Sequence, residues 1–331
     1  LAHSVLWLDA PRLAELCFVS NALLKPRGPH RRLLMSERTA RVAGENPSGS
    51  VLVTPFFRHF VVGGLKLELA PSGHMPGAAQ LRVEGAGSPL VYTGDFDTRQ
   101  GLCAERIHFW KARRLVLRVH YGLDGELFPD RQAERQRLLE WAEGKIAARS
   151  SPVLLYTHPA TAMELLVLLG QAGLRPWIHR SLHELAGGYA RAGVALPQYR
   201  KSRPARDIVP CIWPLRLRKS SSLVPLPRRS FALASGEAAR PDAKRIFDVP
   251  EAFCISCRAD RRGTMEIIEA SGARKIYLSG RRAEPVARWL AGKGLDARLL
   301  APPRQMWLFG ERGIGHITDD PERLFRDNIG E

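Results

Sequence analysis

Two kinds of periodicity divide this chain and restrict how it can fold. From residue 5 to about residue 122, short Val- and Leu-rich runs alternate with turn signals, which predicts a series of strands. The runs are 5–8, 16–19, 51–53, 60–69, 79–83, 90–92 and 115–119. Farther along, apolar runs alternate with segments of helical spacing, which is typical of parallel strands covered by helices. We therefore expect an α/β protein.

The later helices and strands can be placed from the spacing of their apolar residues. Residues 129–150 carry an apolar stripe behind a charged face and predict an amphipathic helix. Strand and helix then alternate over 153–156, 160–173, 177–179 and 181–192, and again over 253–256, 263–270, 275–279 and 283–292.

Between residues 197 and 230 the pattern is lost, and Pro, Ser and basic residues dominate. This stretch is either a solvated surface loop or an edge that contacts phosphates. Under the second interpretation the nucleic-acid-binding residues are Arg200, Lys201, Arg203, Arg206, Arg216, Arg218, Lys219, Arg228 and Arg229.

The overall charge favours a polyanionic partner. The 331 residues include 50 Lys plus Arg against 33 Asp plus Glu, a formal net charge of +17. Of the basic residues 41 are Arg, whose planar guanidinium pairs with phosphate and stacks on bases. A high-GC genome explains the preference for Arg over Lys but not the net charge. We expect nucleic acid as the partner.

The remaining composition bears on where the protein works. The most apolar stretch, residues 153–174, is interrupted by polar residues, so we expect no membrane partner. The five cysteines are scattered and odd in number, which indicates a reducing, cytoplasmic environment.

Two motifs in the strand-rich part carry a family resemblance. SGHMPGAAQ at 72–80 and YTGDF at 92–96 resemble motifs of the metallo-β-lactamase superfamily, specifically its β-CASP branch of nucleic-acid-processing enzymes. The chain looks closest to the bacterial exonucleases encoded with DNA ligases, also labelled mRNA 3′-end-processing factors. In that family the two motifs hold the third histidine ligand and the bridging aspartate of a two-zinc site, here His74 and Asp95. Shorter matches extend the resemblance over residues 5–300.

The resemblance implies a domain organisation. It predicts an αββα metallo-β-lactamase sandwich with an inserted α/β β-CASP domain. Residues 1–122 and 237–304 would form the two parts of the sandwich, 123–236 the inserted domain, and 305–331 a C-terminal tail.

Most of the family's metal ligands are replaced in this chain. After FVS at 18–20 the family has HxHxDH, whereas this chain has Asn21, Leu23, Lys25 and Pro26 at the ligand positions. Only His74 and Asp95 remain, with Asp9 as a supporting carboxylate. A catalytic metal ion needs about three protein ligands. We therefore expect no bound zinc and no intact catalytic set.

Three of the replacements are cationic. Lys25, Arg118 and Arg258 occupy metal-associated positions, so we expect them to lie near His74 and Asp95. They form either an anion- or phosphate-binding site, or side chains that fill a relaxed cavity and pair with Asp95. His120, His158 and Cys257 could in principle rebuild a metal site, but their spacing matches no known ligand cluster.

The tail contains a short peptide, QMWLF at 305–309, similar to those that dock on the DNA sliding clamp. Gln305, Leu308 and Phe309 would make the contacts. The alternative is that these apolar residues pack against the sandwich as a strand.

The sequence as a whole predicts a catalytically degenerate homologue of the β-CASP nucleases. It favours a protein without enzymatic activity over an enzyme. The protein would bind nucleic acid, DNA or RNA, or act as a partner subunit in DNA repair or RNA processing. An active relative, a DNA ligase or the sliding clamp are candidate protein partners. Two alternatives stay open: an active exonuclease or phosphodiesterase with a divergent metal site, and a structural subunit that pairs with an active relative.

Overall fold

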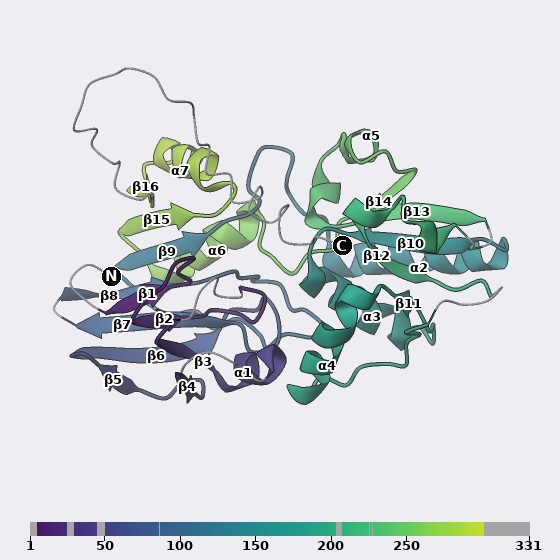
Figure 1. The fold of residues 1–331 in the computed structure, drawn as a ribbon. Coiled ribbons are helices and arrows are strands. Elements are labelled where there is room, and N and C mark those ends of the chain that lie inside the picture. Colours follow the sequence, from purple (N-terminus) through teal and green to yellow (C-terminus); the bar gives the residue numbers. More distant parts are fainter. Residues whose placement is uncertain are drawn as a thin grey trace, which may run out of the picture. The chain divides into compact units, whose positions relative to one another are not determined.

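Three β-sheets organise the part of the chain that the structure, a computed structural model, describes: residues 5–24, 30–44, 50–85, 87–202, 207–224, 226 and 228–300 (Figure 1). Residues 1–300 belong to one compact unit. The expected functional residues Lys25, Arg203, Arg206, Gln305, Leu308 and Phe309 lie outside the described residues.

Two of the sheets pack face to face. The parallel four-stranded sheet contains β1 (Leu6–Leu8), β2 (Leu16–Phe18), β3 (Arg32–Ser36) and β4 (Ser50–Thr54). The mixed seven-stranded sheet has the order β16 (Ala297–Leu299), β15 (Lys275–Ser279), β9 (Arg114–Arg118), β8 (Gly87–Tyr92), β7 (Ala79–Gly85), β6 (Leu65–Pro71) and β5 (Phe60–Val62). Phe18 and Leu34 of the first sheet share a core with Leu69 and Leu81 of the second. This shared apolar core holds the two sheets together.

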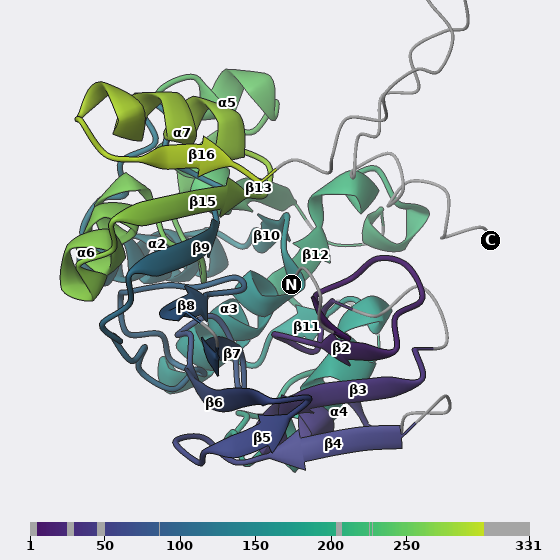
Figure 2. The same ribbon diagram turned by 90° about the vertical axis from the view of Figure 1, so that its left-hand side faces the viewer.

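Helices cover the outer faces of this pair of sheets. Ala40 of α1 (Glu37–Ala43) packs with Leu33 and Met35 on the four-stranded sheet. On the seven-stranded sheet, Ile267 of α6 (Arg261–Ser271) and Leu290 of α7 (Ala283–Gly292) lie in the same core (Figure 2). The layer order is therefore helix, sheet, sheet, helix.

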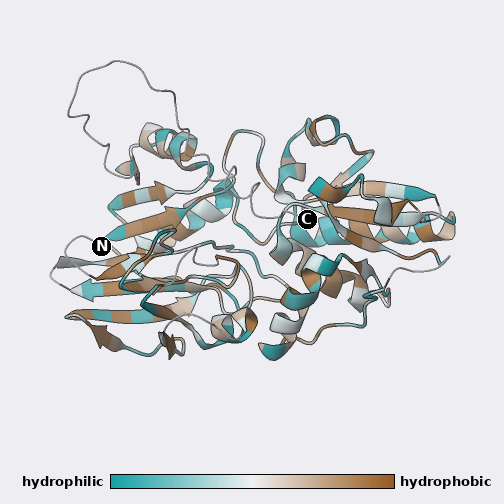
Figure 3. Cartoon of the chain, viewed as in Figure 1, coloured by the Kyte–Doolittle hydropathy of each residue, from teal (hydrophilic) through white to brown (hydrophobic). Residues whose placement is uncertain are grey.

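The third sheet is entirely parallel. Its order is β11 (Trp177–Ile178), β12 (Cys211–Pro214), β10 (Ser151–Tyr156), β13 (Arg229–Ala234) and β14 (Glu251–Phe253). Every residue of β10 is buried, as expected for a strand covered on both faces, and these strands are mostly apolar in Figure 3. Alternation of strands and helices after residue 122 is thus confirmed as a parallel α/β arrangement.

The two faces of this third sheet are covered differently. On one face lie α2 (Arg131–Ala147) and α3 (Pro159–Gln171), with α4 (His183–Arg191) in the same core. On the other face, Leu223 and Leu226 pack against the sheet where a helix would be usual. The short α5 (Ala243–Ile246) precedes β14.

One sequence expectation is wrong. Residues 197–230 are not simply a solvated loop, because β12 lies inside this stretch, between β11 and β10, and Leu223 is fully buried. The strand escaped notice because its four residues, CIWP, are too few to show a period and have basic segments on both sides.

The layered sheets and the parallel sheet share a core. Val42 of α1 and Met75 lie in the same apolar cluster as Leu166 of α3, and Arg38 donates to the carbonyl of Ala192 at 2.9 Å. The parallel sheet also extends past residue 236, the expected end of the insertion, to β14.

Two further observations concern the expected environment. Among the described residues, none of the helices has both the length and the apolar character needed to cross a membrane. All five cysteines are buried and form no disulfide.

Candidate functional site

The turn between β6 and β7 carries His74 and depends on two glycines. Gly73 and Gly77 have φ angles of 80° and 77°, in the left-handed region that glycine adopts without strain. A Cβ on Gly77 would lie 2.2 Å from the backbone nitrogen of Thr39, and one on Gly73 would lie 2.1 Å from the carbonyl oxygen of Asp97. The glycines of the motif therefore allow α1 and the loop after β8 to approach this turn.

Asp95, in the loop after β8, is the centre of a buried group of charges. Its Oδ1 lies 2.7 Å from Nε2 of His120 and 3.2 Å from Nε of Arg118, and its Oδ2 lies 2.9 Å from Nη2 of Arg258. The arginines come from the end of β9 and from the residues before α6. The expected gathering of Arg118 and Arg258 around Asp95 is therefore observed.

A second carboxylate shares these charges. Oδ2 of Asp9 lies 3.8 Å from Nη1 of Arg118, and Asp9 also accepts hydrogen bonds from Ser20 and Tyr92 at 2.7 Å. Two guanidinium groups thus face two carboxylates, so the charges of these four groups can balance without a bound anion. We call Asp9, His74, Asp95, Arg118, His120 and Arg258 the Asp95 cluster.

Two histidines next to Asp95 have unused ring nitrogens. Nδ1 of His74 lies 2.7 Å from the carbonyl oxygen of Cys257; because a carbonyl only accepts, Nδ1 carries the hydrogen and Nε2 is bare. The ring of His158 lies 5.2 Å from that of His74. In the described part of the chain, His74 Nε2 and His158 Nδ1 have no hydrogen-bond partner. With an oxygen of Asp95, these two histidines offer ligand atoms within 4.8 Å of one another.

Burial and charge set the protonation of the cluster. Burial alone would raise the pKa of Asp95, but the charges of Arg258 and Arg118 and the hydrogen bond from His120 outweigh it and hold this pKa well below its usual value. Burial, together with Arg258, lowers the pKa of His120 to about 4. Burial also lowers the pKa values of His74 and His158. At neutral pH the carboxylate of Asp95 is ionised and the three imidazoles are neutral.

The basic stretch does not form one surface. Arg216 follows the carboxyl end of β12, whereas Arg228 precedes β13 and Arg229 begins it, at the opposite end of the sheet. Arg200 and Lys201 lie beside the start of β11, where the backbone of Arg200 forms an isolated β-bridge with that of Trp177. Arg218 pairs with Asp248 at 3.1 Å, and Lys219 is exposed. The described basic residues of this stretch are close in sequence but lie at two opposite ends of the sheet.

Asp97 is a further buried carboxylate that the sequence analysis did not single out. Asp97 accepts two bonds of 3.1 Å from Arg99 and is also paired with Arg131 at the start of α2. The sequence could have pointed to this pair, because Asp97 and Arg99 come within three residues after the YTGDF motif. Asp97 joins the loop after β8 to α2 through Arg131.

Comparison with known proteins gives distant relatives. No family model matches the sequence. A "Probable DNA ligase" of Opitutus terrae is 28% identical over 309 residues, which cover 91% of this chain and 30% of the relative. An "Uncharacterized protein sll0514" of Synechocystis is 31% identical over 158 residues, covering 43% of this chain and 28% of the relative. The chain thus spans less than a third of each curated relative.

A solved structure shares the fold. A protein of unknown function from Enterococcus faecalis superposes with a TM-score of 0.54 at 12% identity, covering 87% of this chain and 79% of that one. At this identity the likeness concerns the fold alone.

Proposed function

We propose that this chain is a nucleic-acid-binding homologue of the β-CASP nucleases in which side-chain ion pairs replace the two-zinc centre. It would serve DNA repair or RNA processing as a binding or partner subunit. The proposal depends on one observation: Asp95 pairs with Arg118 at 3.2 Å and with Arg258 at 2.9 Å. In the family that the motifs resemble, the residue at this position bridges two metal ions.

The residues of the Asp95 cluster do not fit a pair of zinc ions. Zinc takes three or four nitrogen, sulfur or oxygen ligands per ion. Both oxygens of Asp95 already contact cationic or hydrogen-bonding groups of the chain. Arg118 and Arg258 also bring two fixed positive charges into the same partly buried space, where they would repel metal ions.

Charge and ancestry support nucleic acid as the partner. The formal net charge of +17 with 41 arginines suits a phosphate backbone better than a small neutral substrate. The Opitutus relative, matched along 91% of this chain, carries the name "Probable DNA ligase", which favours a role connected with DNA.

A hydrolase with a single metal ion is the second candidate. It is favoured by Nε2 of His74 and Nδ1 of His158, which have no hydrogen-bond partner among the described residues and lie with an oxygen of Asp95 within 4.8 Å of one another. Two imidazoles and one carboxylate are a common ligand set for divalent metals. Against it, Arg258 already holds one oxygen of that carboxylate at 2.9 Å.

Metal analysis and binding measurements on the untagged protein test both candidates. We expect no stoichiometric zinc or manganese, no cleavage of labelled DNA or RNA with added metal, and binding that weakens steeply with salt. A pair of zinc ions per chain would overturn the proposal. A single ion and cleavage that are both lost in His158→Ala, but kept when the half-exposed His59 is changed to Ala, would favour the second candidate. No binding of nucleic acid at low salt would leave only the structural subunit.

A further inference from the structure

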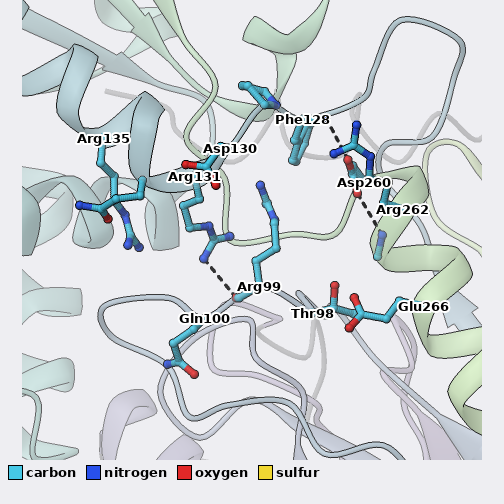
Figure 4. A pocket seen from close by; sticks show the side chains of 13 residues that line it. Thr98, Arg99, Gln100, Phe128, Asp130, Arg131, Arg135, Asp260, Arg262 and Glu266 are labelled. Carbon is cyan, nitrogen blue, oxygen red and sulfur yellow. Dashed lines mark hydrogen bonds between the residues drawn. The ribbon is translucent and has the colours of Figure 1, made fainter.

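A pocket of about 470 Å³ opens between the starts of α2 and α6. Thr98, Arg99 and Gln100, from the loop after β8, line it together with residues of both helices. Figure 4 shows Arg99 in the middle, with Asp130 and Arg131 on one side and Asp260 and Arg262 on the other. The pocket adjoins the Asp95 cluster, because Arg99 donates to the carbonyl of Arg258 at 3.2 Å. Its volume is within the range of sites for small organic groups, about 300–1,000 Å³.

Arg99 forms a fixed planar platform in this pocket. Its Nε and Nη2 each lie 3.1 Å from an oxygen of Asp97, which holds the guanidinium in one orientation. The guanidinium also lies over the ring of Phe128, 4.7 Å from the centroid. About a quarter of the Arg99 side chain, 24%, stays exposed. The part not covered by Phe128 can therefore stack on a flat ligand without first losing side-chain freedom.

The edge of the pocket carries hydrogen-bonding groups and one cationic side chain, Arg262, that forms no ion pair with the described residues. Gln100, Gln132 and Glu266 are exposed lining residues. Arg262 is exposed as well, and no ion pair to it is found among the described residues. The amino-terminal ends of α2 and α6 offer few free backbone donors to an anion. Their capping residues Asp130 and Asp260 already accept hydrogen bonds from the backbone nitrogens of Ala133 at 2.8 Å and Gly263 at 3.0 Å. Contact with an anion therefore depends on Arg262.

We propose that the pocket receives one unpaired nucleotide of a single-stranded nucleic acid. The base stacks on Arg99, its edge meets the polar lining residues, and the adjoining phosphate contacts Arg262. A planar cation with hydrogen-bonding groups around it suits a nucleobase, whereas a simple anion needs no platform. In a duplex the faces of each base are covered by its neighbours, so the pocket selects single strands. This inference rests on the proposed function and names the form of nucleic acid.

The first test uses two variants with the same charge change. Arg262→Glu alters the pocket, and Arg31→Glu alters a side chain that is 75% exposed on the segment before β3. Binding is measured by fluorescence anisotropy with a short single strand and with the matching duplex. We expect Arg262→Glu to weaken single-strand binding about tenfold more than Arg31→Glu does, because only Arg262 contacts the bound nucleotide. Equal losses in the two variants would overturn the inference.

The second test fills the pocket without changing its charge. Gln132→Trp places a large ring in the pocket, and Gln136→Trp places the same ring one turn farther along α2, outside it. The probe is a single strand that contains 2-aminopurine, whose fluorescence falls when it stacks. We expect wild type and Gln136→Trp to quench the probe and Gln132→Trp to lose the quenching.

The two tests separate the possible failures. If wild type binds no nucleic acid, the proposed function fails and the inference fails with it. If wild type binds duplex as tightly as single strands, or if Gln132→Trp quenches the probe as wild type does, the inference alone is wrong.

Discussion

Asp95 shows how one buried carboxylate can hold several charged and polar side chains together. Its two oxygens contact Arg118, His120 and Arg258, which come from different parts of the chain. These contacts hold the pKa of Asp95 well below its usual value, so the group stays charged although it is buried. Removing its charge leaves two guanidinium groups close together with only Asp9 to balance them.

Asp95→Asn is therefore expected to destabilise the fold by about 3–5 kcal/mol, the usual cost of breaking a buried ion pair by removing one partner. The matched control is Asp124→Asn, since Asp124 also pairs with an arginine, Arg261, at 2.6 Å, but its side chain is 94% exposed. Exposed pairs contribute little, so the control should change stability only slightly. Urea unfolding of both variants measures the difference. Equal effects would show that Asp95 does not balance the cluster.

The turns between strands, rather than the strands themselves, bring the site together. The turn between β6 and β7 approaches α1 so closely that the carbonyl of Gly77 accepts from Ser36 Oγ at 2.6 Å and Thr39 Oγ1 at 2.7 Å. The position of His74 therefore depends on a glycine that has no side chain to obstruct this approach.

Gly77→Ala and Gly64→Ala separate steric conflict from backbone strain. Both glycines have nearly the same φ, 77° and 78°, but only at Gly77 would a Cβ meet backbone, 2.2 Å from the nitrogen of Thr39. At Gly64 nothing lies within 4 Å, so alanine should cost about 1 kcal/mol from its unfavourable φ alone. Gly77→Ala should cost more than about 3 kcal/mol, because the turn must move away from α1. Thermal unfolding measures both, and similar melting temperatures would contradict this account.

Strands and helices with a clear apolar period were predictable from the sequence, and the others were not. The strand at 275–279 and the helix at 283–292 have the bounds expected from their patterns. β12 was missed because four residues cannot show a period, and α1 was missed because Ser36 both ends β3 and caps the helix, leaving no turn between them.

At the scale of the whole molecule, some contacts of the candidate site could be predicted from the sequence and others could not. Arg118 and Arg258 could be placed near Asp95 because the motifs fix which loops meet. The pairing of Asp97 with Arg131 could not, since the two residues belong to no common motif and meet only once α2 is packed. The pocket around Arg99 depends on that packing, so it could be found only in the folded chain.

For the proposed nucleic-acid partner, the arrangement of the parallel sheet predicts where the strand would cross the molecule. His158, which follows β10, contacts His74, so the carboxyl ends of the strands face the Asp95 cluster, as ligand sites in such sheets usually do. Arg216 lies at this end and Arg229 at the other, and both side chains are exposed.

Arg216→Glu should therefore lower the slope of log K against log salt concentration by about 1, because one phosphate contact is lost, whereas Arg229→Glu should leave it unchanged. Binding titrations at several salt concentrations measure the slopes. An equal change in both variants would mean that the nucleic acid does not cross at the carboxyl ends of the strands.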